Sequence, residues 1–457
     1  MVYTDVNNRL ISARRSNVLP SKRALSLYLI LPLVAAFAGS LLAQQKMNGS
    51  DLDLVRGILR DARDAVKKNY YDPKYHGVDL DARYQQFDER VKNAPSVGEG
   101  FRMVAAYLDG LKDSHTFFHP PDRAYRQDYG FRMQLIGDSA YIVRTRPGTD
   151  AETKVHPGEL VAHYMGYSVN RGDFEPLSMT FNLLMPQPAL RLDLTDPEGK
   201  SHDVIVNAKV KQEHKIADLT NGTDVYQLVR EEENEDHVVR QRYVESGDVM
   251  IWKVPEFALE DSEVDHLFSV ARKHKTLILD LRSNPGGYVS TLERAVGNLF
   301  DHDVKIADRV GRKETKPQLA KTVGSGHVFT GNVIVLVDSN SASAAELFAR
   351  VMQLEHRGTV IGDHSSGSVM EARHFTYQQG VDTVIPYGFS ITDADLIMTD
   401  GKSLEHAGVT PDELVLPTAA DIANGRDPAL ARAAEMAGYK LDPAEAGKMF
   451  PFEWLPF

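Results

Sequence analysis

The stretch NVIVLVDSNSASAAELFARVMQ, residues 332–353, joins an apolar run to an amphipathic helical pattern. The run at 333–337 is unbroken, which is typical of a strand buried on both faces of a sheet. One polar residue is enough to cap the helix that follows. The turn between them holds several small polar residues: Asp338, Ser339, Asn340, Ser341 and Ser343. This surplus indicates that one of them has a role besides capping.

The same alternation of strand and helix continues on both sides of this stretch. Strands are expected at 249–254, 276–281, 332–337 and 359–362, and helices at 262–274, 288–300 and 342–353. Such an order predicts a layered α/β domain with a largely parallel sheet, whose chemistry lies beyond the carboxyl ends of the strands. Two of those ends carry unusual turns, the glycine turn at 284–287 and the serine turn at 341–343.

A serine at a helix start lies where free backbone N–H groups favour an anion. A tetrahedral oxyanion beside Ser343 could accept a hydrogen bond from the N–H of Ala344. A second donor could come from Gly286 or Gly287, since a backbone without Cβ can approach a substrate closely. The simpler alternative is a plain serine cap on a core helix.

A serine nucleophile needs a base, and the chain offers 16 histidines. The first candidate is His115 in LKDSHTFF (111–118), and His364 in GDHSSG (362–367) is the rival. The spacing of His115 and His119 is also that of a metal pair. No third ligand follows at a recognisable spacing and Pro120 ends any helix there, so neither a metal nor another cofactor is expected.

Composition narrows the class of protein. A length of 457 residues suits two or three domains. The net charge of −12 argues against a nucleic-acid binder, which should present a basic face. The chain has no cysteine, which excludes disulfides and thiolate nucleophiles.

The N-terminus has the pattern of an export segment. Basic residues precede an apolar run at 24–43, and small residues mark a cleavage point near Ala43. An uncleaved anchor is the alternative, because 20 apolar residues could span a bilayer. We expect an extracytoplasmic protein, periplasmic or secreted, that meets a membrane only if this segment is kept.

The chain divides into five regions by pattern. Residues 1–45 are the signal peptide or anchor, 46–122 are helical, 124–212 are β-rich, 246–416 form the α/β core, and 417–457 are a C-terminal extension. The second helix of the helical region is expected to begin at a serine cap, Ser96, and the β-rich region contains a hairpin around DPEGK (196–200).

The core motifs carry a family resemblance. The run LILDLRSNPGG, VIVLVDSNSASAAELFA and TVIGDHSSGS resembles the C-terminal processing, or tail-specific, serine peptidases. LDGLKDSHTFF (108–118) and DGKSLEHAGVTPDELVLPT (400–418) are more similar to the branch with the tricorn core protease and the interphotoreceptor retinoid-binding protein. The resemblance implies a layered core of the ClpP/crotonase type, with an inserted PDZ-like domain at 124–212. It implies a carboxylate-binding loop at Gly130, Phe131, Arg132 and Met133.

The resemblance also implies the catalytic residues. Peptidases with a Ser-Lys dyad carry lysine in the turn where this chain has Ser368, so a dyad is not expected. The tricorn-like branch uses serine, histidine and a carboxylate, which match Ser343, His115 and Glu405 here. Asn340 or Ser341 is then expected to cap the helix. Separate roles in capping and catalysis would explain why the serine turn holds several polar residues.

The resulting hypothesis is an exported serine endopeptidase that acts through an acyl-enzyme and a Ser-His-Glu triad. Its expected partner is a peptide or protein substrate, led in by its C-terminus, and a homo-oligomer is left open. One alternative is an idle binding protein for peptides or an apolar ligand on the same fold, since fold alone does not imply catalysis. Another is a PDZ-type scaffold in an envelope complex.

Overall fold

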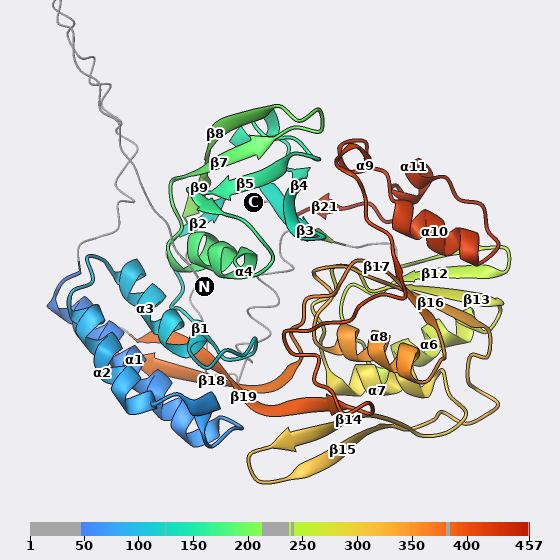
Figure 1. Cartoon of the computed structure of the whole chain (residues 1–457), viewed down its shortest axis with the longest axis horizontal. Coiled ribbons are helices and arrows are strands. Elements are labelled where there is room, and N and C mark those ends of the chain that lie inside the picture. The colour runs from blue at the N-terminus through green and yellow to red at the C-terminus, as the bar shows by residue number, and fades with distance from the viewer. Residues whose placement is uncertain (1–46, 124, 213–236, 239–241, 381–383, 456) are drawn as a thin grey trace, which may run out of the picture. The chain divides into compact units, whose positions relative to one another are not determined.

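The structure is a computed structural model that describes residues 47–123, 125–212, 237–238, 242–380, 384–455 and 457 (Figure 1). The export segment expected at 1–45 lies outside these residues. No helix in the described part of the chain is long and apolar enough to cross a membrane.

Helices form the first described region, as their periodicity predicts. They are α1 (Gly49–Asn69), α2 (Leu80–Lys92) and α3 (Val97–Asp109), with a short 3-10 turn at Tyr75–Gly77. Ser96 caps α3 by accepting the N–H of Glu99 at 3.3 Å, as expected. The apolar faces of the helices pack with Phe118 and Phe389 in one buried cluster.

A β-rich module follows at 125–212. Its main strands are β3 (Phe131–Ile136), β4 (Ser139–Thr145), β5 (Leu160–Tyr164), β6 (Tyr167–Ser168), β7 (Ala189–Thr195) and β8 (Ser201–Asn207). They pair in the order β3-β4-β5-β7-β8, which leaves β3 at one edge. The remaining elements are the ribbon of β2 (Tyr125–Asp128) and β9 (Lys209–Gln212), a 3-10 turn at Asp150–Thr153, and helix α4 (Phe174–Ser178), continued by a π-turn at Met179–Leu184. The expected hairpin around DPEGK is formed by β7 and β8.

The α/β core is built on a sheet in the order β11-β12-β13-β16-β17-β20. Its strands are β11 (Tyr243–Ser246), β12 (Val249–Lys253), β13 (Thr276–Asp280), β16 (Asn332–Val337), β17 (Thr359–Gly362) and β20 (Glu413–Leu414). All neighbours from β12 to β20 run parallel, and β11 is antiparallel to β12. The carboxyl ends of β13 and β16 therefore lie side by side.

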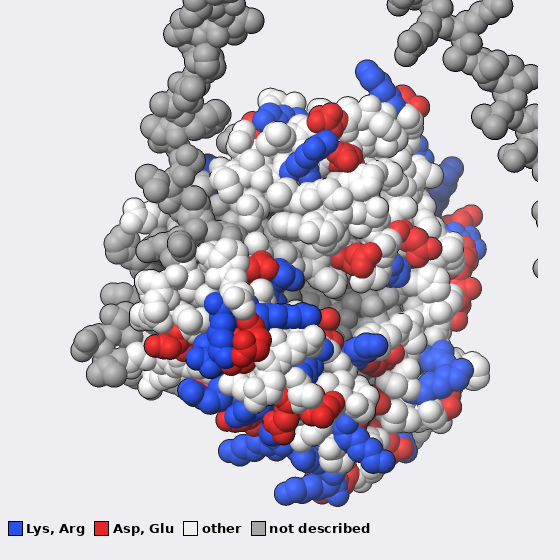
Figure 2. All heavy atoms as spheres, turned by 60° about the vertical axis from the view of Figure 1, so that its left-hand side comes forward, with Lys and Arg blue, Asp and Glu red and all other residues white. Residues whose placement is uncertain are grey.

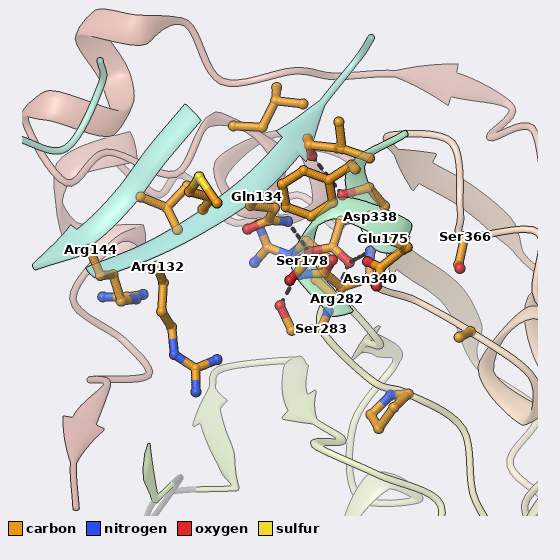
Figure 3. A pocket seen from close by; sticks show the side chains of 18 of the residues that line it. Arg132, Gln134, Arg144, Glu175, Ser178, Arg282, Ser283, Asp338, Asn340 and Ser366 are labelled. Carbon is orange, nitrogen blue, oxygen red and sulfur yellow. Dashed lines mark hydrogen bonds between the residues drawn. The ribbon is translucent and has the colours of Figure 1, made fainter. Parts of the chain in front are cut away.

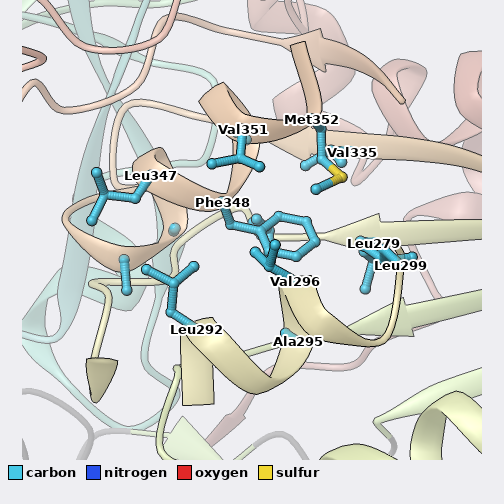
Figure 4. Close-up of a cluster of buried hydrophobic side chains, with 14 of the residues drawn as sticks. Leu279, Leu292, Ala295, Val296, Leu299, Val335, Leu347, Phe348, Val351 and Met352 are labelled. Atoms are coloured by element: carbon cyan, nitrogen blue, oxygen red, sulfur yellow. The ribbon is translucent and has the colours of Figure 1, made fainter. Parts of the chain in front are cut away.

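Helices cover both faces of this sheet, which explains its unbroken apolar strands. On one face lie α6 (Asp261–Ala271), α7 (Val289–Gly297) and α8 (Ala344–Leu354). Leu279 and Val335 point into their cluster, where Phe348 is 1% exposed (Figure 4). Alternate strand residues such as Ile278 and Ile334 face the opposite cluster, with α10 (Pro428–Met436) and α11 (Pro443–Ala446).

A second, antiparallel sheet was not expected from the sequence. It contains β1 (Phe117–His119), β14 (Val304–Gly311), β15 (Thr315–Ala320), β18 (Met370–Gln379) and β19 (Ile385–Met398). Strand β19 pairs with β1 at 388–390 and with β14 at 394–398, so it links the helical region to the core. Two short elements complete the chain, α9 (Ala419–Ala423) and the pair of β10 (His237–Val238) with β21 (Glu453–Trp454).

Charged side chains of both signs are interspersed on the face drawn in Figure 2.

Candidate active site

Ser343 is the N-cap of α8 and has a strained backbone, with φ +53° and ψ −118°. A positive φ is uncommon for a residue with a Cβ and costs about 1–3 kcal/mol, which other contacts must offset. The N–H of Ser343 donates to the carbonyl of Ser368 at 2.9 Å and to the carboxylate of Glu346 at 3.1 Å. The expectation that Asn340 or Ser341 caps the helix is therefore wrong.

Ser341 instead holds the turn in place. Its buried hydroxyl donates to the carbonyl of Leu281 at 2.8 Å and accepts the N–H of Asp338 at 2.9 Å. The N–H of Ala342 donates to the carbonyl of Asn284 at 2.9 Å. These bonds tie the turn after β16 to the glycine turn after β13, so the extra polar residues of the serine turn fix its shape.

The glycine turn lies directly against Ser343. A Cβ built on Gly286 would lie 2.6 Å from the Cβ of Ser343, and the φ of Gly286 is +102°. Only glycine fits there without displacing the serine. The N–H of Gly286 donates to the side chain of Asn284 at 2.8 Å, which leaves the amides of Gly287 and Ala344 as the candidate oxyanion donors.

His115 and Glu405 are joined through a residue that we did not predict. The carboxylate of Glu405 accepts the N–H of Ser114 at 2.6 Å and its hydroxyl at 2.9 Å. The same hydroxyl lies 2.8 Å from Nδ1 of His115. The only signal for Ser114 in the sequence is its position next to His115.

This arrangement selects one form of the His115 ring. A carboxylate only accepts hydrogen bonds, so the hydroxyl proton of Ser114 points to Glu405. The hydroxyl oxygen must then accept from Nδ1–H of His115. Assigned in this way from the hydrogen-bond network, the neutral ring has its proton on Nδ1 and leaves Nε2 free to accept one.

Burial keeps His115 neutral. Burial lowers the pKa of the His115 ring to about 4. The nearby His374 also lowers this pKa, whereas the charge of Asp113 raises it. Glu405, whose side chain is 10% exposed, has its pKa raised by burial, while the bonds from Val369 and Ser114 lower it. A neutral imidazole beside a hydrogen-bonded carboxylate is suited to general-base chemistry.

The loop at 365–369 connects the two halves of the site. Glu346 accepts four hydrogen bonds, including the N–H of Gly367 at 2.7 Å and of Ser368 at 3.0 Å. Burial nevertheless raises the pKa of Glu346 to about 7. The N–H of Val369 donates to Glu405 at 2.8 Å. Within the described residues, no hydrogen bond joins the Ser343 hydroxyl to the His115 ring, so this loop is what links them.

A cavity of about 1340 Å³ reaches this region (Figure 3). Its lining near the serine turn includes Ser114, Ala342 and Ser368. It continues along strand β3 of the β-rich module, where Gln134 donates to Asp338 at 2.7 Å. The cavity thus joins the edge of the β-rich module to the surroundings of Ser343.

The predicted carboxylate-binding loop lies at the start of β3. The N–H of Gly130 donates to Asp128 at 2.7 Å, so it is already used within the module. Phe131, Arg132 and Met133 line the cavity. Arg132 is paired in register with Arg144 of β4, and both arginines are visible beside the cavity in Figure 3. The rival base His364 follows β17, and its N–H donates to Asp363.

Comparisons of sequence match two segments of the chain to known families. Residues 248–415 match the model of peptidase family S41, and residues 54–108 match the tricorn protease C1 domain. The two segments contain most of the core and the N-terminal helices.

Curated relatives agree with these matches. A probable CtpA-like serine protease of Staphylococcus haemolyticus is 22% identical over 78% of this chain and 66% of its own length. A tail-specific protease of Haemophilus influenzae is 27% identical over 68% of this chain and 45% of its own. A putative tricorn protease homolog of Streptomyces coelicolor is 24% identical over 81% of this chain and 31% of its own length. The chain therefore spans less than two thirds of each of these relatives.

Solved structures share the mixed α/β fold. Mature CPAF complexed with lactacystin superposes with a TM-score of 0.60 over 82% of this chain and 96% of that one, at 16% identity. A CPAF mutant gives a TM-score of 0.61. The chain thus contains one segment that matches peptidase family S41 and another that matches the tricorn protease C1 domain, and it is similar to CtpA-like and tail-specific serine proteases.

Proposed function

We propose that this chain is an exported endopeptidase in which Ser343 is the nucleophile, His115 the base and Glu405 the acid that orients the base. The observation that carries the proposal is the hydrogen-bonded series from Glu405 through Ser114 to Nδ1 of His115. That series leaves Nε2 of His115 as the proton acceptor, which is the form that a serine nucleophile requires.

The proposed reaction has two halves. Nε2 of His115 takes the hydroxyl proton of Ser343 as its oxygen attacks the peptide carbonyl, and the amides of Gly287 and Ala344 stabilise the oxyanion. The protonated ring then gives its proton to the leaving amine, which leaves an acyl-enzyme on Ser343. Water, deprotonated by the same ring, attacks the acyl carbon, and the ring returns this proton to the Ser343 oxygen as the acid product leaves. Glu405 stabilises the imidazolium through Ser114 without taking the proton itself.

The β-rich module is proposed to be PDZ-like and to deliver the peptide. Among the described strands, β3 pairs only with β4, so a peptide strand could add to its other edge ahead of Leu135, whose carbonyl already accepts the Ser339 hydroxyl at 2.6 Å. The amides of Phe131 and Met133 are candidates for binding the peptide carboxylate, because Gly130 already donates to Asp128. The cavity along β3 would carry the rest of the peptide toward Ser343.

Labelling with a serine-reactive fluorophosphonate tests the catalytic assignment. The wild type should be labelled at Ser343, and Ser343→Ala should not be labelled. His115→Ala should be labelled far more slowly, because the hydroxyl loses its base. Ser341→Ala is the matched control and should be labelled like the wild type. A folded wild type that neither reacts nor cleaves peptides would support the idle binding protein instead.

Export is a separate part of the proposal. We expect the mature chain to begin near Gln44, after removal of the apolar segment at 24–43. Mass spectrometry of the native protein from the periplasmic or secreted fraction would give its N-terminus. An intact Met1 in a soluble cytosolic fraction would contradict export.

A further inference from the structure

A second carboxylate lies on the other side of His115. The Asp113 side chain accepts the backbone N–H of His115 at 3.1 Å and of Thr116 at 2.7 Å through one oxygen. The hydroxyl of Thr392 donates to the same oxygen at 2.5 Å, and the hydroxyl of Tyr70 donates to the other oxygen at 2.7 Å. Four donors from three parts of the chain therefore converge on one acid.

These contacts define where the His115 turn can lie. Tyr70 follows α1, and Thr392 belongs to β19. Tyr70 and Thr392 are fully buried, and Thr116 is 4% exposed. Thr116 also exchanges hydrogen bonds with Thr392, at 3.0 Å between the hydroxyls and 3.1 Å from the amide. The turn is thus held to rigid elements by buried polar bonds, which are costly to break.

The charge of Asp113 matters as well as its bonds. The titratable groups that face the His115 ring are Asp113 on its own turn, Glu405 through Ser114, and His374 on β18. Asp113 raises the pKa of the ring, whereas burial and His374 lower it. A negative charge near a half-buried imidazole favours the protonated ring that forms when the base accepts a proton.

The neighbouring tyrosine is fixed as a donor. Burial and the charge of Asp113 raise the pKa of Tyr70 well above its usual range, so its hydroxyl stays protonated throughout the working pH. The hydrogen bond that Tyr70 donates partly neutralises the charge of Asp113 and so reduces the effect of that charge on the pKa of His115.

We infer that Asp113 is a positioning residue for the base, which fixes the His115 backbone and supplies a charge that stabilises the protonated ring. This inference rests on the proposed role of His115. It assigns the two carboxylates different tasks, since Glu405 acts on the ring through Ser114 and Asp113 acts from the turn that carries the ring.

Asp113→Asn separates charge from hydrogen bonding, because the amide oxygen can still accept both backbone N–H groups. The acid limb of kcat/KM and the NMR titration of the His115 ring should both move to lower pH. The value of kcat on the plateau should fall about tenfold with KM nearly constant, since a weaker base is a transition-state loss. Asp113→Glu keeps the charge and should leave the limb near its wild-type pH.

Thr116→Val is the matched control for structure alone. It removes the hydroxyl bonds between Thr116 and Thr392 and keeps every donor to Asp113, so it should lower thermal stability and leave the acid limb in place. Tyr70→Phe removes the donor that draws on the charge and should move the His115 titration to higher pH. If Asp113→Asn does not fold, the titration of His115 in Tyr70→Phe decides. The absence of a shift in that titration would overturn the inference.

The proposed base and the proposed role of Asp113 can be refuted separately. If His115→Ala is fully active, the proposed base is wrong and the inference falls with it. If His115→Ala is inactive but folded Asp113→Asn keeps the wild-type limb and kcat, the proposed function stands. In that case Asp113 is only structural and the inference is overturned.

Discussion

Gly286→Ala should inactivate the enzyme without removing any of its polar groups. The new Cβ would lie 2.6 Å from the Cβ of Ser343 and 3.0 Å from both the carbonyl of Ala342 and the amide of Ala344, against 3.4–4 Å for an ordinary contact. Ser343 would have to shift by about 1 Å, and a misplacement of this size can lower kcat about 100-fold. KM should change little, because the cavity along β3 is untouched.

The same substitution also strains the backbone. At a φ of +102° an alanine costs about 1–3 kcal/mol of folding stability. Gly324→Ala is the matched control, because Gly324 has a φ of +96° and no atom within 4 Å of its new Cβ. Both variants should lose stability in thermal unfolding, and only Gly286→Ala should lose peptidase activity. Equal activity of the two variants would refute the close packing of Gly286 on the nucleophile.

Three further predictions concern the nucleophile, the pH profile and the substrate. Ser343→Ala should lower kcat by at least about 10⁴-fold at nearly unchanged stability, whereas Ser341→Ala should lose about 1–3 kcal/mol of stability and keep activity. As pH falls, kcat/KM should decrease partly near pH 7, where Glu346 is protonated and holds the N–H of Ser343 less well, and fully near pH 4, where His115 is protonated. Glu346→Gln should remove only the upper step, and a single step at pH 6.5 in both proteins would contradict the assignment. Peptides with an amidated C-terminus should bind more weakly than free acids by calorimetry, and equal affinity would argue against a carboxylate site on β3.

The core could be predicted because its signals are local. Apolar runs at 277–279 and 333–337 each lie within a strand, and the polar turns after these strands meet because the strands are parallel neighbours. The antiparallel strands β18 and β19 escaped prediction. Their residues alternate irregularly, since β19 is buried by helices at one end and by the core at the other.

The site was less accessible to sequence reasoning for a physical reason. The link between His115 and Glu405 depends on Ser114, whose contacts to Glu405 span 291 positions of the chain. The sequence pattern also could not reveal that the Asn284 side chain accepts the N–H of Gly286, because that hydrogen bond depends on the shape of the turn. Residue types near a motif predict which chemistry is possible, and contacts between distant segments decide which atoms perform it.

The loop at 366–369 fits the proposed triad better than a Ser-Lys dyad. In the resembling dyad peptidases this turn supplies a lysine, which must be strongly desolvated to act as a base near neutral pH. Here Ser368 offers its carbonyl to the N–H of Ser343, and the next amide, from Val369, binds Glu405. The loop supplies no lysine and instead anchors both the proposed nucleophile and the proposed acid. A histidine needs far less tuning than a lysine, and here it is held by a separate turn that is itself fixed to α1 and β19. The base in this chain therefore depends on the contact between the helical region and the core, so destabilising that contact should lower kcat before it unfolds the core.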